Sequence, residues 1–98
     1  MIELGGNIKL DNFDYVDLPT LIIVKKLVGN YAKKIHDNIA PFDELKLKLI
    51  ENNVEGKRVE LGASLTSNEK VCEAFASDVN LFFAIDKALS KIMADIQH

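Results

Sequence analysis

The sequence has little cysteine, no long apolar run and no excess of positive charge, and each shortage excludes a class of protein. It has one cysteine, Cys72, so no internal disulfide can form, and no cluster of cysteine and histidine predicts a zinc site. No apolar run is long enough to span a membrane, and the amino terminus has no basic-then-apolar signal pattern. We therefore expect a cytoplasmic protein that does not span a membrane and holds no metal or other cofactor.

The charge balance is acidic. Fifteen Asp and Glu residues against 12 Lys and Arg give a formal net charge of −3. This balance argues against a protein that coats nucleic acid indiscriminately, but it allows a local basic face because phosphates respond to the local potential. The 98 residues, 48% apolar and 28% charged, suffice for one modest core. We expect a single globular domain over residues 1–98.

Two helices are predicted from apolar residues that recur at alternating spacings of three and four. The first begins near Asp17, carries Pro19 in its first turn and ends before Pro41. Its apolar stripe is Leu21, Val24, Val28, Tyr31 and Ile35. The second starts after Asn80, and its stripe is Phe82, Ile85, Leu89, Ile92 and Ile96. Each helix is therefore expected to bury one face.

Strands are predicted where apolar and polar residues alternate. Residues 2–10 alternate around Gly5 and Gly6, which predicts one strand with a bend or bulge. Residues 43–50 and 58–66 each read as a strand with one buried face, and residues 71–77 read as a further strand. In this last strand the inward set is either Cys72, Ala74 and Ala76, or Val71 and Phe75, and the alternation leaves both open.

The order of elements is therefore β-α-β-β-β-α. A strand, a helix and a strand form a right-handed parallel crossover, and the three strands joined by short turns form an antiparallel meander. Strands with one buried face need one covering layer. The expected fold is an α+β two-layer sandwich with a four-stranded mixed sheet and both helices on one face.

Lysines are the most conspicuous polar residues of both helices. The stretch VKKLVGNYAKK, residues 24–34, places four of them away from the apolar stripe, and Lys87 and Lys91 point outward on the second helix. Two helices side by side would bring these lysines onto one surface, although such faces usually only keep a helix solvated. The acidic residues are scattered and form no motif of general acid and base, so no enzyme is expected.

Ile22, Ile23 and Phe83 point away from the apolar stripes, near the helix starts. They either form an exposed contact patch or are shielded by the connection that contains Phe13 and Tyr15, and we favour shielding.

Phe75 faces the open side of the sheet if Ala74 and Ala76 face inward. An aromatic residue there can stack on a base, but a single one favours cross-strand packing or an oligomer contact. Cys72, in the same strand, is then a small core residue.

Part of the sequence resembles a known family. The run EAFASDVNLFFAIDKALSKI, residues 73–92, is similar to the closing strand and helix of the hibernation-promoting and ribosome-associated inhibitor proteins. The matching residues are Ala74, Ala76, Asp78, Phe82, Ala84, Ile85, Asp86 and Lys87. Two other strands of that family resemble further parts of the sequence. One is similar to RVELGASL, at Val59, Glu60 and Leu61, and the other to the opening IELGGNIKL.

The resemblance implies Ala74 and Ala76 inward and a short, single-domain form without the C-terminal dimerisation extension. It also implies a domain that docks in the messenger and transfer-RNA channel of the small ribosomal subunit and silences idle ribosomes. Basic residues of both helices would contact the rRNA, here Lys25, Lys26, Lys33, Lys34, Lys87 and Lys91.

Two departures bear on rRNA affinity. Asn7 follows Gly6 where the family commonly has Arg or Lys, and the family's helices are often more basic. The alternative is a homodimeric protein-interaction domain of the same fold that does not bind ribosomes. Its contacts would be Ile22, Ile23, Phe75 and Phe83.

Overall fold

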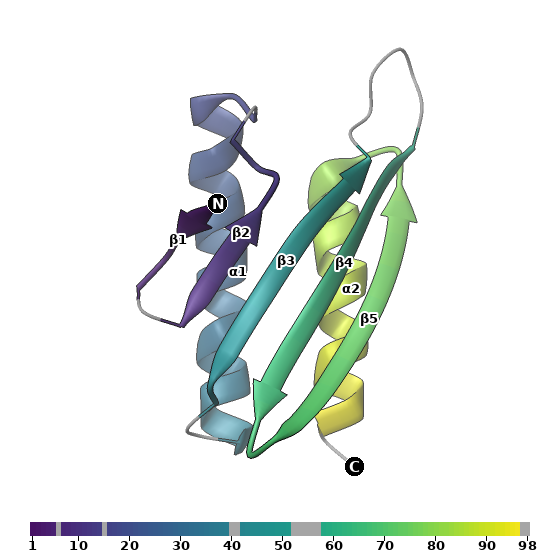
Figure 1. Cartoon of the computed structure of the whole chain (residues 1–98). Helices are drawn as coiled ribbons and strands as arrows, with labels where there is room; N and C mark the ends of the chain where they lie inside the picture. Colours follow the sequence, from purple (N-terminus) through teal and green to yellow (C-terminus); the bar gives the residue numbers. More distant parts are fainter. Residues whose placement is uncertain (6, 15, 40–41, 52–57, 97–98) are drawn as a thin grey trace.

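The computed structural model describes residues 1–5, 7–14, 16–39, 42–51 and 58–96. They form two layers, a five-stranded sheet and two helices that cover one of its faces (Figure 1). The elements in chain order are β1 Ile2–Glu3, β2 Ile8–Asp11, α1 Leu18–Ile39, β3 Glu44–Glu51, β4 Val59–Ser67, β5 Lys70–Asp78 and α2 Leu81–Ile96. The α+β two-layer sandwich is confirmed, with one strand more than predicted.

The extra strand arises where one bent strand was expected. The chain reverses between β1 and β2, which pair antiparallel with Ile2 beside Leu10. The N–H of Leu4 donates to the carbonyl of Ile8 at 2.8 Å, and Gly5 adopts φ = 67°. A glycine reaches this left-handed conformation without steric cost, so it permits a full turn where the sequence suggested a bend.

The rest of the sheet has the predicted connections. β2 and β3 are parallel, with Leu10 beside Leu47, while β3, β4 and β5 follow each other antiparallel. The sheet order is β1-β2-β3-β4-β5, which makes β5 an edge strand. Asn68 and Glu69, both at positive φ, form the two-residue turn between β4 and β5.

Both predicted helix starts are confirmed. The carboxylate of Asp17 accepts a hydrogen bond from the N–H of Thr20 at 3.2 Å. The side-chain oxygen of Asn80 accepts from the N–H groups of Phe82 and Phe83 at 2.8 and 3.1 Å. These side chains satisfy N–H groups that have no partner within the first turn, and so they fix where each helix begins.

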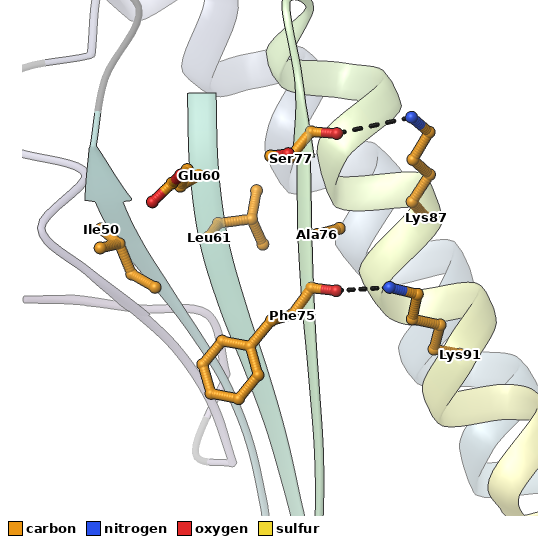
Figure 2. Close-up of a pocket in the computed structure, with 8 residues that line it drawn as sticks. All are labelled: Ile50, Glu60, Leu61, Phe75, Ala76, Ser77, Lys87 and Lys91. Atoms are coloured by element: carbon orange, nitrogen blue, oxygen red, sulfur yellow. Dashed lines mark hydrogen bonds between the residues drawn. The ribbon is translucent and has the colours of Figure 1, made fainter. Parts of the chain in front are cut away.

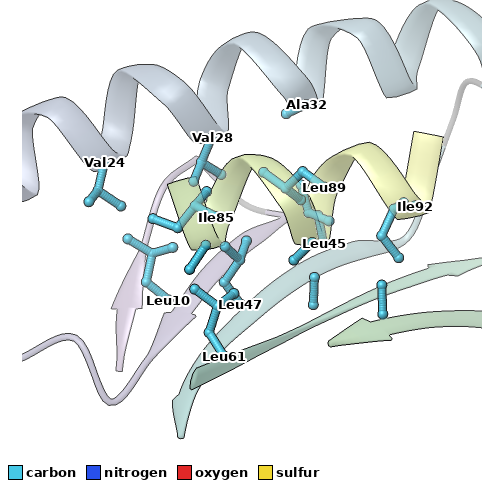
Figure 3. Close-up of a cluster of buried hydrophobic side chains, with 14 of the residues drawn as sticks. Leu10, Val24, Val28, Ala32, Leu45, Leu47, Leu61, Ile85, Leu89 and Ile92 are labelled. Carbon is cyan, nitrogen blue, oxygen red and sulfur yellow. The ribbon is translucent and has the colours of Figure 1, made fainter. Parts of the chain in front are cut away.

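The core lies between the helices and the sheet (Figure 3). Leucines of β2, β3 and β4 meet both helices, and the predicted inward residues of β3 and β4 are buried. On α1 the predicted stripe needs one correction, because Ala32 is buried while Tyr31 is only half-buried. In α2, Phe82 and Ile96 lie at the margin of the core, and Ala84 and Ala88 are fully buried.

Ala74 and Ala76 face the helices, as the family resemblance implied. Ala74 is buried, whereas Val71 and Phe75 on the other face of β5 are 58% and 59% exposed. A helix lies close above this strand, so small side chains fit there and large ones do not.

Candidate nucleic-acid interface

Helix α1 has a surplus of positive charge. It has four lysines and one aspartate, whereas α2 has two lysines and two aspartates. Lys25, Lys26, Lys33 and Lys34 are all exposed, and none forms an ion pair with a described residue. Lys34 lies over the ring of Tyr31, 5.2 Å from its centroid. All four ammonium groups are therefore available to phosphate.

The two lysines of α2 are bound to strand β5 (Figure 2). Lys91 donates to the carbonyl of Phe75 at 2.6 Å. Lys87 pairs with the carboxylate of Asp78 at 2.7 Å and also reaches the carbonyl of Ser77 at 3.4 Å. The hydrogen bond from Lys87 lowers the pKa of Asp78. Both ammonium groups are turned toward the sheet edge.

A row of polar contacts separates the two sets of lysines. The hydroxyl of Tyr31 on α1 donates to the carboxylate of Asp86 on α2 and lies 3.0 Å from the hydroxyl of Ser90. The side of α2 that faces α1 thus carries Asp86 and Ser90, and the side that faces β5 carries Lys87 and Lys91. The four α1 lysines lie along one helix, and the structure does not bring those of α2 onto the same surface.

The sheet's open face has no comparable surplus of positive charge. Lys9 pairs with Glu44 at 3.0 Å, and Lys46 lies 3.9 Å from Asp11. The Glu44 contact raises the pKa of Lys9 through its hydrogen bond. Because these cations have acidic neighbours, the open face attracts phosphate less strongly than α1 does.

The expected shielding of the helix starts is wrong. Ile22, Ile23 and Phe83 are 56%, 50% and 62% exposed. Phe13, one of the two proposed covering residues, is fully buried in the core, and Tyr15 lies outside the described residues. The starts of α1 and α2 lie at the same end of the sandwich, so the three residues belong to one end of the molecule (Figure 1).

Phe75 belongs to a different surface from those three residues. It lies on the open face of the sheet, opposite Gly62 of β4. A Cβ atom on Gly62 would come within 2.9 Å of the Phe75 ring, so the ring packs directly over this glycine. The expected cross-strand packing is confirmed, and the four candidate patch residues do not form a single patch.

No group of three or more His, Cys, Asp or Glu residues within the described ranges could hold a metal ion. None of the described helices is both long and apolar enough for a membrane span. Cys72 donates to the carboxylate of Asp95 at 3.2 Å, and burial, followed by this bond, raises the pKa of the thiol to about 11. A thiol with this pKa is a poor nucleophile.

Known proteins were compared with this chain by sequence and by structure. No family model and no curated protein matches the sequence. Among solved structures, a ribosomal subunit interface protein from Coxiella burnetii superposes with a TM-score of 0.62 at 12% identity, over 93% of this chain and 91% of the other. The chain has the fold of a ribosomal subunit interface protein.

A second solved structure agrees. The N-terminal domain of Protein Y from Thermus thermophilus matches with a TM-score of 0.62 at 16% identity, over 92% of this chain and 91% of that domain. The family resemblance seen in the sequence is therefore confirmed in the fold over almost the whole chain. At these identities the likeness concerns the fold and not the residues of a binding surface.

Sequence reasoning missed the contacts that occupy Lys87 and Lys91, and the residues that make them. Their partners are main-chain carbonyls of β5 and the carboxylate of Asp78. A carbonyl is present at every residue, so the sequence holds no signal for such a contact. The role of Tyr31 was likewise missed, because its spacing placed it in the apolar stripe.

Proposed function

We propose that this protein is a non-catalytic domain that binds the small ribosomal subunit, with α1 as the surface that contacts rRNA. Its contacts are the ammonium groups of Lys25, Lys26, Lys33 and Lys34. Bound there, it would inhibit translation or protect idle ribosomes. The observation that carries the proposal is the positive α1 surface on a fold shared with a ribosomal subunit interface protein.

Lysines suit a surface that contacts the RNA backbone. An ammonium group is a compact charge on a flexible stem, and it binds phosphate without reading a base. The four α1 lysines recur as two pairs eight residues apart, about two helical turns, so they spread along roughly 12 Å of the helix. This length suits contacts to several phosphates of a folded RNA.

Lys87 and Lys91 have a smaller part in the proposal. Their ammonium groups already bind β5, so a phosphate must compete with a carbonyl or with Asp78. We expect them to add less to the affinity than the α1 lysines. Charge alone would predict equal contributions, since each lysine carries the same unit charge.

Sedimentation with purified small subunits, at low and at moderate salt, tests the proposal. We expect the protein to co-sediment, with an affinity that falls as salt rises. Lys26→Glu combined with Lys33→Glu should abolish the binding and leave the circular dichroism spectrum unchanged. Absence of co-sedimentation at both salt concentrations would refute the proposal.

A matched control separates local from total charge. Lys48→Glu combined with Lys70→Glu changes two exposed lysines away from α1 and gives the same net charge of −7 as the α1 variant, since each exchange adds −2 to the initial −3. This control should still co-sediment. Equal loss in both double variants would mean that total charge, and not the α1 surface, governs binding.

A second candidate function is a homodimeric protein-interaction domain of the same fold without ribosome binding. It is favoured by the exposure of Ile22, Ile23 and Phe83 at one end of the helix layer. Light scattering should then show a dimer that Ile22→Lys dissociates. A monomer at high concentration would contradict this candidate.

A further inference from the structure

Strand β5 has an edge with which no described strand pairs. It is nine residues long, lies at the end of the sheet and pairs, among the described strands, only with β4. Its open face carries Val71 and Phe75, both more than half exposed. The free edge of a long strand with apolar residues presents main-chain groups that can pair with another strand.

The contacts of α2 show which groups of β5 point outward. The carbonyl of Phe75 receives a hydrogen bond from Lys91, and the carbonyl of Ser77 receives one from Lys87, both from α2 (Figure 2). The guanidinium of Arg58, just before β4, also donates to the carbonyl of Ser77 at 3.1 Å. These donors are side chains and not main-chain groups of β4. The N–H and C=O of one residue in an antiparallel ladder point to the same side, and this side alternates along the strand. The outward groups of β5 therefore belong to Val71, Glu73, Phe75 and Ser77.

We propose that β5 pairs antiparallel with β5 of a second copy of this chain, about a two-fold axis at Ala74. Glu73 then lies opposite Phe75 of the second copy, and Val71 lies opposite Ser77. All four residues have outward N–H and C=O groups, so each of these pairs can exchange two main-chain hydrogen bonds. The two sheets become one sheet of ten strands, with all four helices on the same face.

Charge complementarity selects this register. With the axis at Ala74, Lys70 at one end of β5 lies opposite Asp78 of the second copy, and the same pair recurs at the other end. A two-fold axis at Glu73 would place the Glu73 carboxylates of the two copies opposite each other. A two-fold axis at Phe75 would place the Lys91 ammonium groups of the two copies opposite each other, because Lys91 binds the carbonyl of Phe75. Like charges directly opposite each other are destabilising.

The helices above the two edges are complementary in the same register. On the β5 side of α2, Lys91 lies level with Phe75 and Asp95 lies level with Cys72. The two-fold axis brings Lys91 within about one strand residue, roughly 3.4 Å, of the level of Asp95 in the second copy. Lys91 can then exchange its carbonyl contact for a carboxylate. Because the interface has two-fold symmetry, the pair of Lys91 and Asp95 occurs twice in the dimer.

The contact of Lys91 also sets a condition for pairing. In the single chain its ammonium group covers the carbonyl that Glu73 of the second copy must reach. A lysine at an edge strand is a common protection against pairing. The carbonyl of Ser77, which Val71 of the second copy must reach, is likewise bound by Lys87 and Arg58. Pairing therefore requires all three side chains to move, and we expect a dimer that forms reversibly with concentration.

Sedimentation velocity over a wide range of protein concentration tests the proposal. We expect a reversible monomer–dimer equilibrium. Glu73→Pro removes an outward N–H without touching the β4–β5 hydrogen bonds, a position at which an edge strand accepts proline. This variant should be monomeric, whereas the matched control Glu73→Ala should still dimerise. A monomeric wild type, or a Glu73→Pro variant that folds and still dimerises, would overturn the proposal.

Two further variants keep the test decisive if Glu73→Pro does not fold. Asp95→Lys places like charges across the axis and should weaken the dimer at least tenfold, and the additional change Lys91→Asp should restore it. Failure of the double variant to recover would count against this register. Ile22→Lys lies far from β5 and should leave the dimer intact, so dissociation by that change alone would assign the dimer to the helix starts instead.

Discussion

The hydroxyl of Tyr31 on α1 donates a hydrogen bond to the carboxylate of Asp86 on α2, 55 residues further along the chain. The contact joins the two helices above the core, and Ser90 completes it at 3.0 Å. Burial, followed by the bond to Asp86, raises the pKa of Tyr31. The side of α2 that carries Asp86 therefore faces α1, while Lys87 and Lys91 bind β5 on its other side.

Replacing Tyr31 by Phe should lower the free energy of unfolding by about 1 kcal/mol, the typical value of one hydrogen bond. The ring remains, so the packing is kept and only the hydroxyl is lost. Urea denaturation followed by circular dichroism measures the change. Ser90→Ala serves as the comparison and should cost less, because the Tyr31–Asp86 bond, which involves a charged acceptor, stays in place. Equal stability of Tyr31→Phe and the wild type would show that the bond contributes nothing.

Gly29→Ala should stabilise the protein by up to about 1 kcal/mol, the difference in helix propensity between the two residues. Nothing lies within 4 Å of the position that its Cβ would occupy, so an alanine side chain fits there without a clash. Gly62→Ala is the contrasting change and should destabilise, because its Cβ would collide with Phe75. Thermal unfolding of both variants checks the pair of predictions, which fail if the two shifts have the same sign.

Cys72 should react slowly with alkylating reagents in the native protein. Its pKa of about 11, against an ordinary value of 9.0, leaves roughly a hundredfold less thiolate at neutral pH. Timed alkylation with and without denaturant measures the difference. Asp95→Asn removes one cause of the raised pKa and should speed the native reaction, while burial keeps it below the unfolded rate. A native rate equal to the unfolded rate would contradict this reading of the site.

The same thiol should make the free energy of unfolding fall at high pH. Its pKa is raised in the folded state, so its contribution is fully present below the ordinary pKa of 9.0, which we take for the unfolded chain, and is lost as the pH rises toward 11. The Cys72→Ala variant should therefore lose less stability than the wild type between these two pH values. Parallel stability curves for the two proteins would contradict the expectation.

Asp78 should contribute to stability at neutral pH and lose that contribution in acid. The hydrogen bond from Lys87, and then the one from the N–H of Asn80, lower its pKa. A lowered folded pKa gives stability that is present above the unfolded value of about 3.9 and is lost as the pH falls through the folded value. Asp78→Asn should thus be less stable than the wild type at neutral pH.

The difference between Asp78→Asn and the wild type should narrow as the solution is acidified. Denaturant titrations at several pH values measure it. Asp37→Asn changes an exposed carboxylate of α1 that forms no ion pair with a described residue, and it serves as the control for the loss of one charge. A constant difference for Asp78→Asn at all pH values would refute the role of this carboxylate.

Much of the fold follows from local patterns. Alternation marked β3, β4 and β5, and apolar spacing with Asp17 and Asn80 marked the two helices. Gly5 was noticed as a break, but whether it bends the strand or reverses it depends on the pairing of β1 with β2, which no local pattern encodes. The choice between the two faces of β5 also required more than alternation, since the strand carries apolar residues on both sides.

The placement of the lysines was likewise predictable only in part from the sequence. The sequence by itself determined that lysines lie on the outer faces of both helices, because the apolar stripes leave them no other place. Only the tertiary structure decided that the α1 lysines stay exposed while Lys87 and Lys91 bind the edge of β5. The physical reason is that a helix has two flanks, and the element packed against each flank is set by contacts between residues far apart in the chain. Tyr31, Asp86 and the carbonyls of β5 make those contacts.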